Sequence, residues 1–166
     1  MPRQRSFFVY FCHCILEFMD FNSIFDIDSN NAFEKKALEI FKFQFKENPV
    51  YRSFCDLLYK HPSDIHKLED IPFLPIEFFK THKVVSSNKE VQQIFTSSGT
   101  TGSVVSKHHI ANLNIYKSSF QKGFAHFYGN SEDYAFLALL PSYLEREGSS
   151  LVYMANDMIN QSKHPR

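Results

Sequence analysis

The 166-residue sequence has no tryptophan, five glycines, three cysteines and a formal net charge of zero. Three cysteines, an odd number, do not form a disulfide framework, so we expect a reduced, intracellular protein located in the cytoplasm. Without a charge excess or a basic stripe there is no electrostatic argument for a nucleic-acid partner. The apolar stretch at residues 6–16 is too short to cross a bilayer, so we expect no membrane span.

Phenylalanine, by contrast, is abundant, with 19 residues, and it follows a helical period near the N-terminus. The apolar face formed by Phe33, Ala37, Phe41 and Phe45 predicts a helix that begins at Asn31 and ends at Asn48-Pro49. A similar pattern from Tyr51 predicts a second helix that ends near His61. Cys55 lies on this second helix among apolar neighbours, which is typical of a small core residue. These helices are expected to form a packing layer.

The remainder of the chain predicts strands mixed with helices. We expect a strand at Val91–Phe95, a short second strand at Val104–Val105, and a buried central strand at Tyr134–Leu140. We expect one helix that ends at Gly129 and a second helix that begins at Gly148-Ser149-Ser150. The inner face of the first helix is formed by Leu113, Tyr116, Phe120, Phe124 and Phe127. The predicted fold class is α/β, with an N-terminal helical layer followed by part of a mixed sheet flanked by helices.

One stretch is rich in small and hydroxylated residues, and it follows directly on the first predicted strand: Thr96, Ser97, Ser98, Gly99, Thr100, Thr101 and Gly102. Glycines permit close backbone approach, successive amides can form an anion-binding nest, and hydroxyl groups add donors, so the pattern favours a phosphate-binding loop. It is not a Walker A loop, because the nearest lysine, Lys107, stands five residues past Gly102. The alternative is a flexible polar surface loop.

Other polar residues near this loop are candidates for substrate binding. His108 and His109 are adjacent, so on a strand they point in opposite directions and cannot chelate one ion. One of them could bind nucleotide or substrate, although a structural role is the favoured interpretation. Arg146 could pair with a phosphate or carboxylate, and Ser149 opens a helix whose N-terminus could face an anion.

The first 18 residues differ in character from the rest of the chain. They contain Cys12-His13-Cys14, but no second Cys/His pair stands at ligand spacing, so we expect no metal site. Two arginines precede an apolar run that has no small-residue cleavage site. We interpret residues 1–18 as a spurious or disordered extension upstream of the domain. A tail that touches a membrane is the alternative.

The loop sequence resembles the nucleotide loop of adenylate-forming enzymes, whose consensus is T-S-G-T-T-G-x-P-K. Here one serine is extra before Gly99, no proline follows Gly102, and Lys107 lies further along than the family's lysine. A closer resemblance is to the LuxE-like acyl-protein synthetases. It extends over Ile71–Lys80, Ser106–His109 and Ala138–Arg146, and in all covers the chain from Met19 onward.

This resemblance implies an enzyme that uses ATP and Mg²⁺ to activate a carboxylic acid, expected to be a fatty acid, as an acyl adenylate. Transfer to a protein thiol would follow, with an acyl-accepting protein as partner. Thr96 to Gly102 and Lys107 would bind the nucleotide, and His108, Arg146 and Ser149 would lie near the substrate. Residues 19–166 would be the N-terminal part of the acyl-adenylating domain, truncated before the catalytic lysine and acyl-accepting cysteine, so no complete catalytic set is expected here. The alternatives are a non-catalytic module of the same fold and an acyltransferase.

Overall fold

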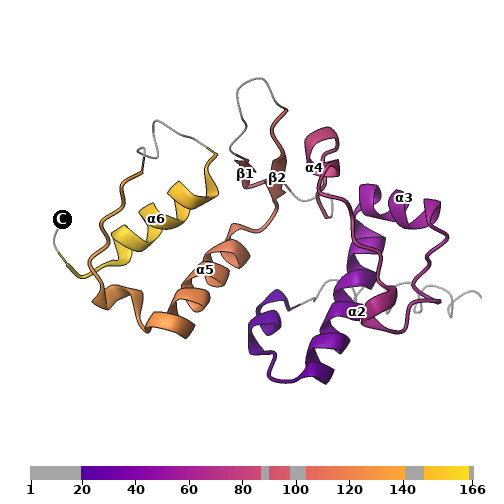
Figure 1. Ribbon diagram of the computed structural model, residues 1–166, viewed down its shortest axis with the longest axis horizontal. Coiled ribbons are helices and arrows are strands. Elements are labelled where there is room, and N and C mark those ends of the chain that lie inside the picture. The colour runs from indigo at the N-terminus through magenta and orange to yellow at the C-terminus, as the bar shows by residue number, and fades with distance from the viewer. Residues whose placement is uncertain (1–19, 87–89, 98–103, 141–147, 165–166) are drawn as a thin grey trace, which may run out of the picture.

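The computed structural model describes residues 20–86, 90–97, 104–140 and 148–164. Helices α2, α3 and α4 lie on one side of a β-hairpin, and helices α5 and α6 lie on the other side (Figure 1). The elements in chain order are η1 (Phe21–Asp26), α2 (Asn30–Glu47), α3 (Pro49–Leu57), η2 (Leu68–Asp70), α4 (Phe78–Thr81), β1 (Gln93–Thr96), β2 (Lys107–Ile110), α5 (Leu113–Tyr128), η3 (Ser131–Asp133) and α6 (Ser150–Gln161). The α/β class and the N-terminal helical layer are confirmed.

Asn48 determines how α2 turns into α3. It ends α2, and its side-chain oxygen accepts from the amide nitrogen of Tyr51 at 3.2 Å, so the same residue caps the start of α3. Pro49 fits the first position of a helix because its missing N–H would have no helical partner there. The predicted break between the two helices is therefore confirmed. The predicted end of the second helix near His61 is wrong, because Tyr59 takes a positive φ of 55° and α3 ends at Leu57.

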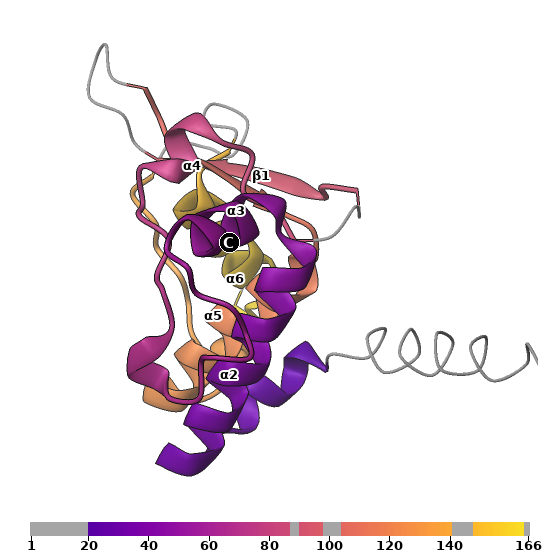
Figure 2. The same cartoon turned by 90° about the vertical axis from the view of Figure 1, so that its right-hand side faces the viewer.

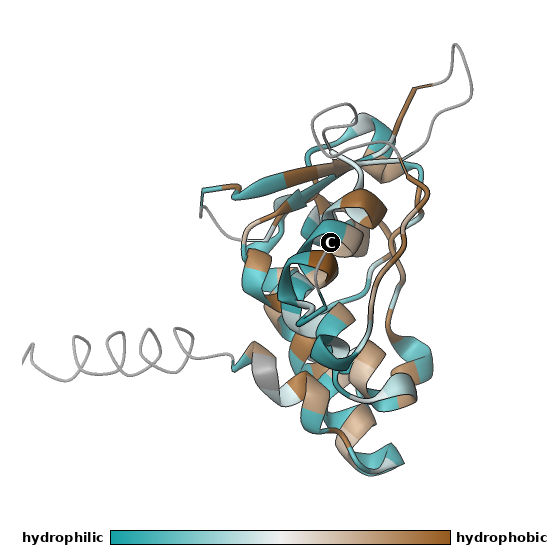
Figure 3. Cartoon of the chain, turned by 90° about the vertical axis from the view of Figure 1, so that its left-hand side faces the viewer, coloured by the Kyte–Doolittle hydropathy of each residue, from teal (hydrophilic) through white to brown (hydrophobic). Residues whose placement is uncertain are grey.

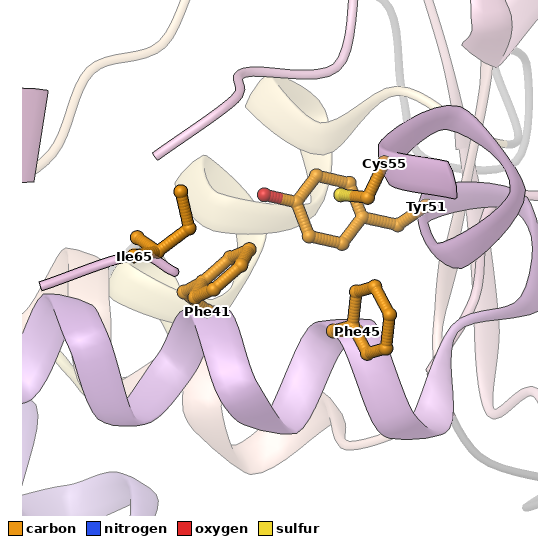
Figure 4. Close-up of a cluster of buried hydrophobic side chains, with 5 residues drawn as sticks. All are labelled: Phe41, Phe45, Tyr51, Cys55 and Ile65. Carbon is orange, nitrogen blue, oxygen red and sulfur yellow. The ribbon is translucent and has the colours of Figure 1, made fainter. Parts of the chain in front are cut away.

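A small aromatic core joins α2 to α3. Tyr51 and Cys55 point from α3 toward Phe41 and Phe45 of α2, with Ile65 beside Phe41 (Figure 4). Cys55 is fully buried, as its apolar neighbours in the sequence predict. The Tyr51 hydroxyl donates to the carbonyl oxygen of Pro72 at 2.6 Å, which ties the extended segment after η2 to the same core.

Strands β1 and β2 pair antiparallel and form the hairpin. The register pairs Gln93 with Ile110 and Thr96 with Lys107. The prediction of a second strand at Val104–Val105 is wrong, because the ladder begins at Lys107. The two valines lie on the loop side of the last strand pair, where Val104 is exposed.

An aromatic cluster joins the hairpin to α5 and α6. The Phe95 ring of β1 lies 4.9 Å from the Tyr116 ring of α5 and 5.5 Å from the Tyr153 ring of α6, measured between centroids. Helix α5 ends at Tyr128, and Gly129, with a φ of 85°, is its C-cap, as predicted. Tyr116, Phe120 and Phe124 of the predicted inner face of α5 make aromatic contacts within the fold, whereas Phe127 is exposed and its ring contacts are with its neighbours His126 and Tyr128.

The prediction of a buried central strand at Tyr134–Leu140 is wrong. The segment is extended but carries no strand pairing in the described part of the chain, and Leu137 and Leu139 are almost entirely exposed. Figure 3 shows this side of the molecule coloured by hydropathy. Among the described residues the sheet consists of β1 and β2, and this segment joins neither of them.

Figure 2 shows α2 and α3 in front of α5 and α6, so the molecule has two helical sides with the hairpin at one end. Across this arrangement η1 packs against α5, and Phe21 makes an edge-to-face contact with Phe43 of α2. Within the described ranges, no helix is both long enough and apolar enough to cross a bilayer. The predicted extension at residues 1–18 lies outside these ranges.

Candidate functional site

The hairpin is closed at its loop end by two serines. The Ser97 amide donates to the Ser106 carbonyl oxygen, and the Ser106 amide donates to the Ser97 hydroxyl oxygen, both at 3.1 Å. Ser106 is buried, whereas the side chain of Ser97 remains accessible. The chain between these serines contains most of the predicted phosphate loop. The pairing therefore fixes where that loop leaves and rejoins the sheet.

The N-terminus of α6 lies against the end of β1. The Thr96 amide donates to the Gly148 carbonyl oxygen at 2.8 Å. Gly148 has a φ of 83°, and a Cβ atom added there would lie 3.2 Å from the Thr96 hydroxyl oxygen. Only glycine satisfies both the backbone conformation and the close approach without strain. The strand end that precedes the loop and the start of α6 thus form one junction.

Lys107 stands opposite Thr96 in the ladder and has an exposed side chain. Lys107 is therefore the first residue of β2, at the base of the loop and not within it. A lysine in this position places a positive charge beside the strand ends. Ser98, Gly99, Thr100, Thr101 and Gly102 lie outside the described residues, as does Arg146.

Ser149 is the N-cap of α6, and its hydroxyl oxygen accepts from the amide of Val152 at 3.4 Å. The sequence correctly places a helix start here. The sequence did not predict the contact of Gly148 with Thr96. A glycine before a helix start is recognisable from its neighbours in the chain, but Thr96 lies 52 residues earlier.

The two adjacent histidines of β2 have different surroundings, as the alternation of a strand predicts. The His108 ring stacks on the Phe79 ring of α4 with centroids 4.7 Å apart, and its Nε2 lies 3.4 Å from the Ser106 hydroxyl oxygen. The Nδ1 atom of His109 is buried and makes no hydrogen bond. His108 thus joins the hairpin to α4, and His109 carries a polar atom that the described protein leaves unsatisfied.

The surroundings of His109 favour its neutral form. Burial lowers the pKa of the imidazole below its ordinary value of 6.5, and the positive charges of Lys83, Lys107 and His108 lower this pKa further. A hydrogen bond between the ring and the backbone of Lys107 has the opposite, smaller effect. Because cations gather around this ring, an anion placed nearby would be stabilised.

The chemical capacity of the junction is that of an anion site. The junction offers hydrogen-bond donors, namely the backbone amides near the start of α6 and the hydroxyl groups of Thr96 and Ser97. It also offers one cation, the ammonium group of Lys107. Within the described ranges, no three His, Cys, Asp or Glu side chains gather as metal ligands. The described Cys55 is buried, and burial raises the pKa of its thiol, so it is a poor nucleophile.

Comparison with known proteins gives the family. The family model described as "Acyl-protein synthetase, LuxE" matches residues 14–124, which is about two thirds of the chain and includes the hairpin and most of α5. The chain belongs to this family. The resemblance on which the sequence interpretation was based is thus confirmed.

Two curated relatives are both named long-chain-fatty-acid–luciferin-component ligase. The protein from Photorhabdus luminescens is 36% identical over 70 residues, which is 42% of this chain and 60% of that protein. The protein from Aliivibrio fischeri is 36% identical over 80 residues, which is 47% of this chain and 20% of that protein. The chain therefore spans less than two thirds of the length of either relative. No solved structure matches it.

Proposed function

We propose that this chain forms the N-terminal part of an ATP-dependent acyl-protein synthetase that activates a fatty acid as an acyl adenylate and passes the acyl group to a protein thiol. Membership of the LuxE family supports this reaction class. The names of the two relatives support a long-chain fatty acid as the substrate. The observation that carries the assignment to this site is the junction of Thr96 with Gly148, since it places the entrance of the loop at a helix N-terminus.

The reaction would join two anions. The carboxylate oxygen attacks the α-phosphorus of ATP, the bond from that phosphorus to the bridging oxygen breaks, and pyrophosphate leaves. No proton is transferred in this step, so no general base is needed. The protein contributes by orienting the reactants and by placing donors and cations against the developing charge.

The residues present fit a nucleotide substrate in their donor chemistry. The Ser97 side chain is accessible at the mouth of the loop, and Lys107 places an exposed ammonium group opposite Thr96. Proteins usually hold Mg²⁺ through one or two carboxylates together with the phosphates of the substrate. Mg²⁺ would enter bound to ATP and would neutralise part of the phosphate charge.

The proposal is tested by acid-dependent exchange of labelled pyrophosphate into ATP, catalysed by the full-length protein. We expect exchange to require both Mg²⁺ and a long-chain fatty acid, and to be absent when the alcohol of equal chain length replaces the acid. Release of phosphate without pyrophosphate exchange would contradict adenylation. Acyl transfer from preformed acyl-CoA without ATP would favour the acyltransferase alternative instead.

A further inference from the structure

A cavity of about 530 Å³ lies between α2 and the chain segment from η2 to Ser86. Its volume is within the usual range for small-molecule sites. On α2 the wall includes Phe33, Ala37 and Ile40, and it continues to Asn48 at the helix end. Fifteen residues of helix at 1.5 Å each extend over about 22 Å, so the cavity is long and follows the helix axis. Its far wall carries apolar side chains, among them Leu74 and Phe79.

The polar groups in the wall are mostly paired within the protein. The Gln44 side-chain oxygen accepts from the Asn48 side-chain nitrogen at 3.2 Å and from the Ser86 hydroxyl at 2.7 Å. The Tyr51 hydroxyl donates to the Pro72 carbonyl oxygen. A ligand therefore meets a surface that is apolar along most of its length, and such a surface suits an unbranched hydrocarbon chain.

One polar atom of the wall is different. His109 lines the cavity, and its Nδ1 is the buried side-chain nitrogen or oxygen that has no hydrogen-bond partner in the described chain. A buried polar group without a partner is costly, so a ligand group that bonds to it gains affinity. The charges of Lys83 and Lys107 act on the same imidazole, so the potential there favours a negatively charged group.

Strand β2 carries His109 and lies at the same end of the molecule as the C-terminal end of α2 (Figure 1). Gln44, Asn48 and Ser86 are at this end of the cavity too, whereas Phe33 and Ala37 are near the start of α2. The cavity is thus apolar toward the start of the helix and polar toward the hairpin. β2 also leads from the loop assigned to ATP.

We propose that this cavity holds the hydrocarbon chain of the fatty-acid substrate along α2, with the carboxylate accepting a hydrogen bond from His109, whose neutral ring would carry its proton on Nδ1. This inference rests on the proposed function for the identity of the ligand. It assigns a binding site to residues that precede the nucleotide loop. It also assigns His109, and not its neighbour His108, to recognition of the head group.

The test is direct binding of fatty acids to the full chain without ATP, measured by isothermal titration. We expect saturable binding of one fatty acid per chain, with affinity rising about fourfold for each added methylene until the cavity is full. The alcohol of equal length should bind about ten- to a hundredfold more weakly than the acid, since a hydrogen bond to a charged group is lost. Absence of saturable binding would overturn the proposal.

Two pairs of variants locate the ligand. Ala37→Phe fills the middle of the cavity and should lower affinity for the acid and the alcohol alike by at least tenfold, whereas Ala125→Phe, at an exposed alanine of α5, should not. His109→Phe should abolish the preference for the acid, whereas His126→Phe, at an exposed histidine, should preserve it. Unchanged binding in Ala37→Phe would place the chain elsewhere and overturn the assignment.

If Ala37→Phe fails to fold by circular dichroism, Phe33→Glu replaces it. Phe33 is half-exposed, so the fold tolerates a carboxylate there, while the apolar wall is interrupted. It should weaken binding of the long acids most.

Binding and catalysis are measured separately: exchange without binding in this cavity would refute the cavity assignment alone. Binding without exchange by the full-length protein would refute adenylation alone.

Discussion

The amide of Thr96 and the carbonyl oxygen of Gly148 are joined by a hydrogen bond of 2.8 Å, which holds the start of α6 against the end of β1. The two residues are 52 positions apart, and the predicted phosphate loop begins directly at one of them. The contact explains why a glycine stands at position 148, since a side chain there would press on the Thr96 hydroxyl.

Replacing Gly148 by alanine should lower the free energy of unfolding by about 1–3 kcal/mol, because alanine is strained at a positive φ and its Cβ would approach Thr96 too closely. Urea denaturation of the full chain measures this change. Two other glycines are matched controls. Gly129→Ala has the same backbone strain, at a φ of 85°, without a close contact of the added Cβ atom. Gly123→Ala, on α5, should raise the free energy of unfolding by about 0.5–1 kcal/mol. A Gly148→Ala variant as stable as the wild type would contradict the junction.

The core of α2 and α3 should weaken at alkaline pH. Burial raises the pKa of Tyr51 above its ordinary 10.0 and that of Cys55 above its ordinary 9.0. Both groups are neutral in the folded protein and would ionise more readily when unfolded. Their contribution to stability is therefore fully present below pH 9 and is lost as the pH rises toward the raised values.

Measuring the free energy of unfolding from pH 7 to 11 checks this dependence. The double variant Tyr51→Phe and Cys55→Ala should show a shallower decline than the wild type, although it is less stable at neutral pH, where the Tyr51 bond to Pro72 is lost. In the same experiment, alkylation of Cys55 should be slow until the protein unfolds. Equal slopes of the free energy of unfolding against pH in both proteins would show that folding does not change the pKa values of these two groups.

The exposed leucines of the segment after η3 should cause self-association. Leu137 and Leu139 are almost fully exposed, and large apolar side chains exposed close together favour contacts between molecules. Replacing both by lysine should lower association in sedimentation velocity runs at high concentration. The midpoint of thermal unfolding should stay within a few degrees of the wild type. A large fall in that midpoint would show that these side chains are packed in solution.

Local signals in the sequence predicted the described helices well. Gly129 and Ser149 lie at helix ends because the backbone requirements of caps are encoded within a few residues. The period-four apolar face of α2 likewise predicted both the helix and the buried positions Phe41 and Phe45.

Features that depend on distant partners were not predicted. The apolar run at Tyr134–Leu140 has the composition of a central strand, but burial requires a covering layer that composition alone does not guarantee. The sequence predicted the second strand at Val104–Val105, but the strand begins at Lys107, after the pair of hydrogen bonds between Ser97 and Ser106. The adjacency of His108 and His109 predicted opposite directions but not which ring lines the cavity, since that depends on how α2 packs.

The central claim is that the loop entered at Thr96 binds the phosphates of ATP, and the most direct test is acid-dependent pyrophosphate exchange by loop variants of the full-length protein. Gly102→Val should abolish exchange, because a phosphate nest requires close backbone approach. Thr100→Ala should lower the rate by about ten- to a thousandfold through the loss of one donor. Gly123→Ala should keep the wild-type rate. Normal exchange in a folded Gly102→Val protein would show that the residues from Thr96 to Gly102 form only a surface loop.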